Sequence, residues 1–333
     1  MVSPYLKNKG SAVRFCLWPP IMILIIKKLY RYFILKKVPR KIKNNFKKLT
    51  KQYMTQIEEI LLENYFNNAK EITKDDLEDH IKNRIFVSRI KVIPWIMKNL
   101  ELNNKKVLEV GCGTGSSSIT MAEQGAEVTG IDVDIQSIKV ARLRANLLDL
   151  KIEFLKFSGT QINKLNQRYD VVIYYATLEH MTVEERIESL KQAYSILSED
   201  GYLIVVEAPN RLWIEDTHTS ELPFFQWLPD NLAYLYTKFS EKQSFNSKYL
   251  DTEYLKLDEF YRRGRGVSYH EFDLAFNKSE DLIIISSLNR LVYSKNLVNT
   301  FVYKKLFKLY LKKFTDKNKA FFNEYLDIIF QKS

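Results

Sequence analysis

The fold is decided by one stretch of sequence, Lys105-Lys106-Val107-Leu108-Glu109-Val110-Gly111-Cys112-Gly113-Thr114-Gly115. Its apolar run, Val107 to Val110, indicates a short buried strand. Three of the chain's ten glycines then follow on alternate positions, and hydroxyl residues able to cap a helix begin at Ser116. A strand, a glycine turn and a helix N-terminus in this order let a ligand lie against bare backbone.

The spacing of these glycines discriminates between nucleotide sites. The dinucleotide fingerprint, G-x-G-x-x-G, needs its third glycine at position 116, which is Ser116 here. The pattern E-x-G-x-G-x-G, from Glu109 to Gly115, resembles the first motif of class I S-adenosylmethionine-dependent methyltransferases. That resemblance covers about residues 85–210 and implies S-adenosylmethionine as cofactor and methyl donor. The cofactor contacts expected on this basis are Glu109, Gly111, Cys112, Gly113, Gly115, Asp132, Val133, Ser158 and Tyr174.

An acidic residue follows the glycine turn at the spacing in sequence that suits a ribose contact. A second predicted strand, 126–132, ends at Asp132, about 20 residues beyond the turn. An acid at this point accepts hydrogen bonds from both ribose hydroxyls of an adenosine ligand. Asp134 is instead expected to cap a helix over 135–149.

The pattern continues regularly through the middle of the chain. Strands are predicted at 151–156, 169–175 and 202–207, with a helix over 182–197 capped by Thr182 and Glu185. This alternation predicts an α/β fold, a Rossmann-like, doubly wound, mostly parallel sheet with helices on both faces. Ligands of such sheets bind beyond the carboxyl ends of the strands. The glycine turn, Asp132 and Ser158 are expected at that edge, where Ser158 replaces the acid that the family usually places near the adenine.

Charge and cysteine content restrict the class of protein. The net charge is +11, but residues 1–50 hold thirteen basic and no acidic residues, which leaves the rest of the chain close to neutral. The two cysteines exclude a disulfide framework and fit a reducing compartment. We therefore expect a cytoplasmic protein, with peripheral attachment at the inner membrane face as an alternative.

Both ends of the chain carry basic amphipathic patterns. The apolar run at 17–26 is about half of the roughly 20 residues that span a bilayer. Residues 17–48 and 301–314 suit helices lying on an anionic membrane surface. A helix docked on the body of the protein is the alternative, and a nucleic-acid arm is the least favoured partner.

The resemblance directs the search for catalytic residues to the segment after the fourth strand. Methyl transfer to a hydroxyl requires alignment and loss of a proton, which a base assists. The run Thr177 to His180 resembles the Leu-Glu-His element of ubiquinone-pathway O-methyltransferases and the Glu-x-x-Glu-His element of small-RNA 2′-O-methyltransferases. In the RNA enzymes both glutamates and the histidine help bind a divalent metal, but the first glutamate position here is Ala176. We therefore assign no metal site, leave a divalent metal open, and name as catalytic candidates Glu179, His180, Asp216 and His218.

Other basic and histidine residues suit structural roles better than functional ones. His80, Arg84 and Arg89 lie on the helical run before the first strand, over the expected cofactor. The basic turn 262–266 suits either a phosphate or carboxylate on the acceptor or a solvated loop, the latter being slightly favoured.

These observations divide the chain into five predicted parts. They are a basic amphipathic arm (1–50), a helical extension (51–104), the cofactor-binding core (105–207), an aromatic-rich acceptor-binding insertion or lid (208–280), and a final strand with basic C-terminal helices (281–333). The insertion's aromatics either line the acceptor site or build the insertion's own core. The predicted function is O-methylation of a small-molecule, lipid-linked or glycan acceptor. The alternatives are an RNA 2′-O-methyltransferase-like enzyme and a non-catalytic, membrane-associated adaptor with the same fold.

Overall fold

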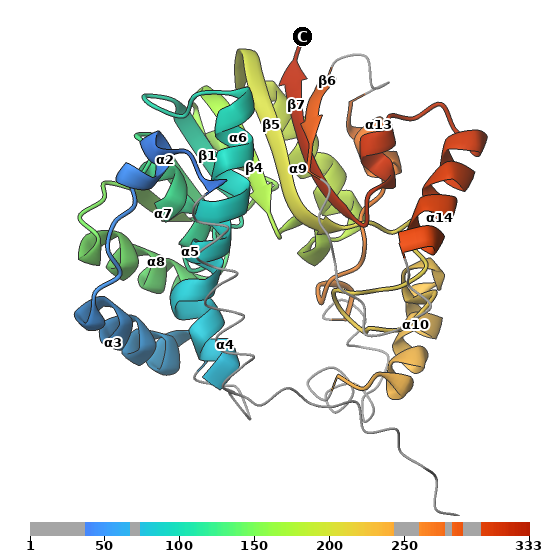
Figure 1. Cartoon of the computed structure of the whole chain (residues 1–333), viewed down its shortest axis with the longest axis horizontal. Coiled ribbons are helices and arrows are strands. Elements are labelled where there is room, and N and C mark those ends of the chain that lie inside the picture. Colours follow the sequence, from blue (N-terminus) through green and yellow to red (C-terminus); the bar gives the residue numbers. More distant parts are fainter. Residues whose placement is uncertain (1–36, 67–73, 243–259, 277–281, 289–300) are drawn as a thin grey trace, which may run out of the picture.

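A seven-stranded sheet lies at the centre of the molecule (Figure 1). The structure is a computed structural model and describes residues 37–66, 74–242, 260–276, 282–288 and 301–333. The strands are β1 (Lys106–Val110), β2 (Glu127–Asp132), β3 (Glu153–Lys156), β4 (Tyr169–Tyr175), β5 (Leu197–Pro209), β6 (Leu282–Ser287) and β7 (Tyr325–Lys332). Their order is β3-β2-β1-β4-β5-β7-β6. Strands β1 to β5 pair in parallel, and β7 is antiparallel to both neighbours, β5 and β6.

Helices cover both faces of this sheet. One face packs against α2 (Arg40–Asn44) and α6 (Ile93–Asn99), and the other packs against α9 (Val183–Ile196) and α13 (Tyr269–Ala275). The other described α-helices are α3 (Lys51–Ile60), α4 (Lys74–Glu78), α5 (Arg84–Val87), α7 (Ser116–Ala122), α8 (Ile135–Leu147), α10 (Asp230–Tyr236) and α14 (Phe301–Phe314). This arrangement confirms the predicted doubly wound, mostly parallel fold.

The alternation of side chains along β4 explains why both faces are covered. Val171 and Ile173 pack on the α6 side, whereas Val172 and Tyr174 pack on the α9 side. Successive residues of a strand point to opposite faces, so a strand covered on both faces needs a continuous apolar run. The predicted capping box of the helix that follows is also present, with Thr182 and Glu185 bonded reciprocally.

The C-terminal end corrects one prediction. We expected a final strand near residue 281 followed only by helices. Strand β6 and helix α14 confirm part of this, but residues 325–332 form β7, inserted between β5 and β6. The segment is buried from Leu326 to Phe330, because it lies inside the sheet rather than on its surface.

The described part of the N-terminal arm is also not a free arm. Val38 and Ile42 are buried in the core on the α6 side. The Lys47 N–H donates to Glu123, and Arg89 donates to the Lys47 carbonyl. Residues 37–50 are therefore part of the body, as the docked-helix alternative expects. The apolar run at 17–26 lies outside the described residues.

The insertion has a small core of its own. Phe225, Ala233 and Phe260 are buried together, with Leu222, Leu228, Tyr234 and Tyr236 packed around them. The buried guanidinium of Arg265 donates to the carbonyls of Phe225 and Leu228. These aromatics therefore stabilise the insertion itself, which is the second of the two interpretations given above.

Candidate active site

A cavity of about 870 Å³ lies at the carboxyl ends of β1, β2 and β4. We call one side the glycine end, which is lined by Gly111, Cys112, Gly113, Asp132, Val133 and Ser158. We call the other side the histidine end, which is lined by His180, Glu185, His218, Lys242, Arg262 and Arg263. One continuous cavity therefore joins the predicted cofactor turn to the predicted catalytic histidines.

The three glycines of the turn are needed for different reasons. All three have positive φ, +72° at Gly111, +50° at Gly113 and +80° at Gly115. A Cβ on Gly111 would lie 2.2 Å from Cγ2 of Thr177, and one on Gly115 would lie 2.9 Å from the Ala141 Cβ. A Cβ on Gly113 would meet nothing within 4 Å, so this residue is open to the cavity. Gly111 and Gly113 line the cavity, whereas Gly115 allows α7 and α8 to approach each other.

Asp132 is held at the edge of the glycine end by backbone donors. Its Oδ2 accepts from the Gly113 N–H and its Oδ1 from the Asp134 N–H, each at 2.8 Å. Each carboxylate oxygen can accept a further hydrogen bond. Burial raises the pKa of Asp132, although these backbone donors oppose the shift. Asp134 caps α8 through the N–H groups of Gln136 and Ser137, as predicted.

Besides Gly115, two expected cofactor residues do not line the cavity. Glu109 is fully buried beneath the turn and accepts hydrogen bonds from the hydroxyls of Ser117 and Ser118. Burial raises the pKa of Glu109 to about 7. Tyr174 is also fully buried, and its hydroxyl bonds Ser189. It faces the core because neighbouring strand residues alternate, and Tyr175 lines the cavity instead.

The helical extension contributes a wall that the sequence analysis largely missed. Tyr65, Asp79, Arg84, Val87 and Ser88 all line the cavity. The fully buried Arg144 ties this wall to the turn, because its guanidinium donates to the carbonyls of Thr114, Ile81 and His80. The expected structural roles hold for two residues there. His80 is buried against Tyr65 and Phe66, and Arg89 pairs with Glu123.

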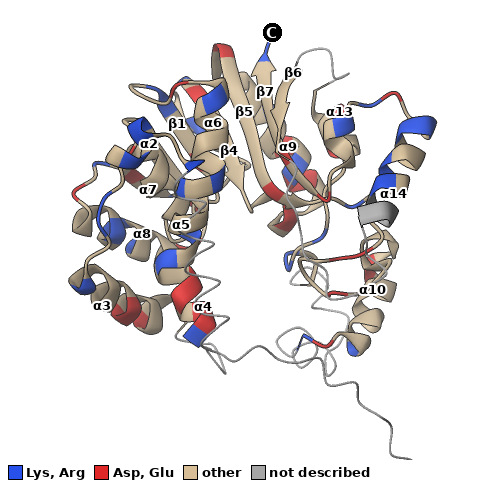
Figure 2. Ribbon diagram, viewed as in Figure 1, with Lys and Arg blue, Asp and Glu red and all other residues tan. Residues whose placement is uncertain are grey.

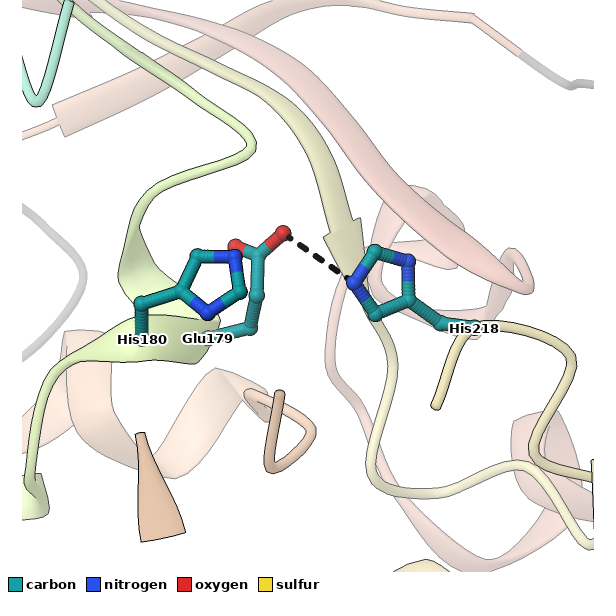
Figure 3. Close-up of side chains that lie close together, drawn as sticks. All are labelled: Glu179, His180 and His218. Carbon is teal, nitrogen blue, oxygen red and sulfur yellow. Dashed lines mark ion pairs between the residues drawn. The ribbon is translucent and has the colours of Figure 1, made fainter. Parts of the chain in front are cut away.

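The histidine end brings together three candidate side chains from two segments (Figure 3). Glu179 and His180 come from the turn after β4, and His218 comes from the loop after β5. One potential ligand atom of each lies within 4.8 Å of the others. Oε1 of Glu179 lies 3.8 Å from Nε2 of His218, and the two histidine ring centroids lie 6.3 Å apart.

The hydrogen bond of His180 fixes its tautomer. Nδ1 lies 2.7 Å from the Arg262 carbonyl oxygen. Because a carbonyl can only accept, Nδ1 carries the proton, and the neutral ring keeps a lone pair on Nε2. Burial lowers the pKa of His218, although the Glu179 carboxylate opposes this. The lowered pKa favours a neutral His218 ring at neutral pH.

Asp216 has a different role from the one expected. Its carboxylate accepts hydrogen bonds from the backbone N–H groups of His218, Thr219 and Ser220 and from the Ser220 hydroxyl. It is 2% exposed and does not line the cavity. Asp216 therefore shapes the loop that presents His218, and it does not orient the imidazole ring directly.

The rim of the histidine end is basic. Lys242, Arg262 and Arg263 line it, and Figure 2 shows basic residues on the loops of this side. Arg262 makes a two-pronged ion pair with Glu185, at 2.6 and 2.8 Å. The lining from the insertion is thus polar and cationic rather than apolar, which corrects the expected apolar lid. It also corrects the slightly favoured solvated loop at 262–266, because Arg265 is buried and both Arg262 and Arg263 line the cavity.

Comparison with known families accounts for the glycine end. A family model described as a methyltransferase domain matches residues 107–201. The chain carries a class I S-adenosylmethionine-dependent methyltransferase domain. This domain contains the glycine turn, Asp132, Glu179 and His180, whereas His218 and the basic rim lie beyond the matched residues.

Relatives of the methyltransferase domain match only part of the chain. The ubiquinone biosynthesis O-methyltransferase of Aliivibrio fischeri (strain MJ11) is 36% identical over 108 residues, which are 32% of this chain and 46% of that protein. That of Yersinia enterocolitica is 30% identical over 129 residues, covering 38% of this chain and 52% of that protein. A putative methyltransferase of Geobacillus sp. (strain WCH70) is 30% identical over 30% of this chain and 41% of its own length. The chain thus spans about half the length of these relatives.

Solved structures give a weaker likeness. The magnesium protoporphyrin IX methyltransferase of Synechocystis PCC 6803, solved with bound SAM, is 23% identical with a TM-score of 0.37. The alignment covers 49% of this chain and 80% of that one.

Several lining residues outside the methyltransferase domain had no local signal. Lys242 comes from the insertion, and Tyr65 comes from the helical extension. Isolated basic or aromatic residues in these segments fit many roles. The basic turn at 262–266 was the one visible signal.

Proposed function

We propose that this protein transfers the methyl group of S-adenosylmethionine to a hydroxyl of an acceptor bound at the histidine end. The supporting observation is the single cavity that joins the glycine turn and Asp132 to His180 and His218, beside which the buried Glu179 lies. The glycine end would hold the donor on backbone and on the Asp132 carboxylate. The acceptor would then lie between the donor and the two imidazole rings.

The proposed reaction is an in-line displacement. The acceptor oxygen attacks the methyl carbon as the carbon–sulfur bond breaks, and the bonding electrons stay on sulfur, giving S-adenosylhomocysteine. The hydroxyl proton leaves at the cluster of Glu179, His180 and His218. Alignment of this kind lowers a barrier by roughly 7–11 kcal/mol, and proton removal adds about 10²–10⁴-fold in rate.

The acceptor would carry a negative charge close to its hydroxyl. Lys242, Arg262 and Arg263 line the histidine end, where Arg262 also pairs with Glu185. Guanidinium and ammonium groups bind carboxylates and phosphates well. We therefore propose a small-molecule or lipid-linked acceptor that bears a carboxylate or phosphate, and we give glycan and RNA acceptors a lower rank.

The first experiment is calorimetry of the full chain with S-adenosylmethionine and S-adenosylhomocysteine. Binding of both, followed by release of S-adenosylhomocysteine with hydroxybenzoates but not with the matching benzoates, would support the proposal. A chain that binds neither compound would be an adaptor that keeps the fold. Turnover with RNA but with no small hydroxyl compound would favour the RNA enzyme.

We also propose that α14 contacts an anionic membrane surface. Leu306, Leu309, Tyr310 and Phe314 are each more than half exposed on it. Lys305, Lys312 and Lys313 lie on the same helix and suit acidic headgroups. Among the described residues no helix has the length and apolarity to cross a bilayer.

Vesicle sedimentation tests the membrane contact. The full chain should sediment with vesicles rich in phosphatidylglycerol and remain in solution with phosphatidylcholine alone. The double variant Leu309→Glu, Phe314→Glu should lose this binding, while Leu62→Glu, an exposed position on the helical extension, should keep it. Equal binding by both variants would remove α14 from the contact.

A further inference from the structure

The carboxylate of Glu179 lacks the partners that a buried charge requires. The residue is 0% exposed, and neither of its side-chain oxygens has a hydrogen-bond partner. The nearest cationic candidate is Nε2 of His218, which lies 3.8 Å from Oε1, beyond hydrogen-bond distance. Burying a carboxylate without a hydrogen bond or a counter-charge is costly. A cation bound beside Glu179 would supply the counter-charge that this carboxylate needs.

Other buried carboxylates in the described part of the chain show what a satisfied group looks like. Asp216 accepts four hydrogen bonds, and Glu271 pairs with Arg186 and bonds Ser268. Glu109 accepts two hydroxyls. Against this background Glu179 is the exception among the described residues, because both of its oxygens are left unbonded while they face two imidazole rings.

We propose that Glu179, His180 and His218 bind a divalent first-row transition-metal ion. The potential ligand atoms lie within 4.8 Å of one another. Ligand atoms on one ion at roughly 2.0–2.2 Å lie at most about 4 Å apart, so small side-chain rotations complete the set. The ion supplies the charge that the buried carboxylate lacks.

The surroundings of the histidines suit ligation. A ligating histidine usually donates its second ring N–H to a carbonyl or carboxylate, which fixes the ring and its tautomer. His180 makes this bond with Nδ1 to the Arg262 carbonyl, which leaves Nε2 for the ion. Asp216 fixes the loop of His218 through backbone N–H groups. Both histidines are therefore positioned by groups that are not themselves ligands.

The ligand set indicates the class of ion. Two imidazole nitrogens with one carboxylate suit Zn²⁺, Fe²⁺, Co²⁺ or Mn²⁺ better than Mg²⁺ or Ca²⁺, which prefer oxygen. Three protein ligands leave open positions facing the cavity. An acceptor hydroxyl bound there would lose its proton to solvent more readily, because the ion would stabilise the resulting oxyanion. This consequence rests on the proposed function and gives His180 the role of a ligand in place of a base.

Direct binding to the untagged full chain tests the inference. After removal of metal with a chelator, Co²⁺ and Zn²⁺ should bind with one ion per chain by calorimetry. Co²⁺ should give the visible absorption of nitrogen and oxygen ligation. Glu179→Gln, His180→Ala and His218→Ala should each weaken binding at least tenfold, while His270→Ala, an exposed histidine on α13, should bind like the unchanged chain. No stoichiometric binding, or binding that survives all three cluster substitutions, would overturn the site.

A second measurement does not depend on metal affinity. In the metal-free protein, Glu179→Gln should raise the melting temperature, because it removes an unpaired buried charge without changing the shape of the side chain. Added Zn²⁺ should then stabilise the unchanged chain more than Glu179→Gln. Equal stabilisation of both by Zn²⁺ would contradict the site. Methyl transfer that persists undiminished in chelator would contradict the metal site and leave the proposed function intact. Metal binding without donor binding would support the metal site and contradict the proposed function.

Discussion

The two ends of the cavity are built in opposite ways. The glycine end is formed by the turns that follow three successive strands, β1 to β3, and its polar contacts use backbone groups, such as the Gly113 N–H on Asp132, 19 residues away. The histidine end is assembled from side chains of distant segments, as when His180 bonds the Arg262 carbonyl 82 residues away. Backbone geometry that is encoded locally is recognisable in a sequence. A site made by side-chain convergence depends on how the whole insertion folds.

Each end is fixed by one fully buried arginine. Arg144 ties the glycine turn to the helical extension through the Thr114 and His80 carbonyls. Arg186 ties the turn after β4 to the insertion, because it donates to the carbonyls of Leu178, Arg265 and Gly266 and pairs with Glu271. The comparison therefore predicts that the two ends can be weakened separately.

The largest expected effect is on turnover at the histidine end. His180→Gln should lower turnover by about 10²–10⁴-fold, since it removes the Nε2 lone pair with which His180 holds the proposed ion or takes the proton of the acceptor. The affinity for S-adenosylmethionine should stay within about twofold by calorimetry. A variant with unchanged turnover would place the chemistry elsewhere, and His270→Ala serves as the matched control.

Removal of the arginine at the histidine end should be nearly as severe. Arg186→Met leaves Glu271 buried without its partner, and breaking such a pair typically costs roughly 3–5 kcal/mol. Urea unfolding should report this loss, while the remaining folded protein keeps its affinity for the donor. Arg144→Met should instead weaken donor binding. If both variants weaken donor binding equally, the two ends form a single unit.

The contribution of the glycine end to the free energy of unfolding should depend on pH. Burial raises the pKa of Glu109 to about 7, so the fold favours its protonated form. The corresponding stability is fully present below about pH 4.5 and is lost as the pH rises through 7, a change of about 3 kcal/mol. Urea unfolding of the unchanged chain should therefore give a lower free energy of unfolding at pH 8 than at pH 5. In Glu109→Gln this difference should be absent. Parallel curves for the two proteins would show that Glu109 does not titrate in this way.

The smallest effect compares one residue from each end. Asp132→Ala removes a charged acceptor for the donor's ribose and should weaken S-adenosylmethionine binding about 10–100-fold. His218→Ala should change that affinity less than about twofold. Calorimetry of the two variants measures both. Equal losses would refute the assignment of the donor to the glycine end.

The sequence predicted the methyltransferase domain well because its signals are local. The strand, the glycine turn and the acid at Asp132 follow one another at fixed spacing, and strand burial on two faces produces continuous apolar runs. The prediction was wrong for Tyr174, where a shift of one residue along a strand exchanges the core face for the cavity face. It was also wrong for Asp216, because an acid near a histidine does not reveal whether it bonds the ring or the backbone.

The sequence by itself determined the five parallel strands, the turn on which a nucleoside can rest and the position of Asp132, since neighbours in the chain create them. Only the tertiary structure decided that β7 enters the sheet, that residues 37–50 join the body, and that His218 meets Glu179 and His180. These contacts join segments far apart in the chain. They form because apolar surface is buried and buried charges such as Arg186 find partners, and no local pattern records that outcome.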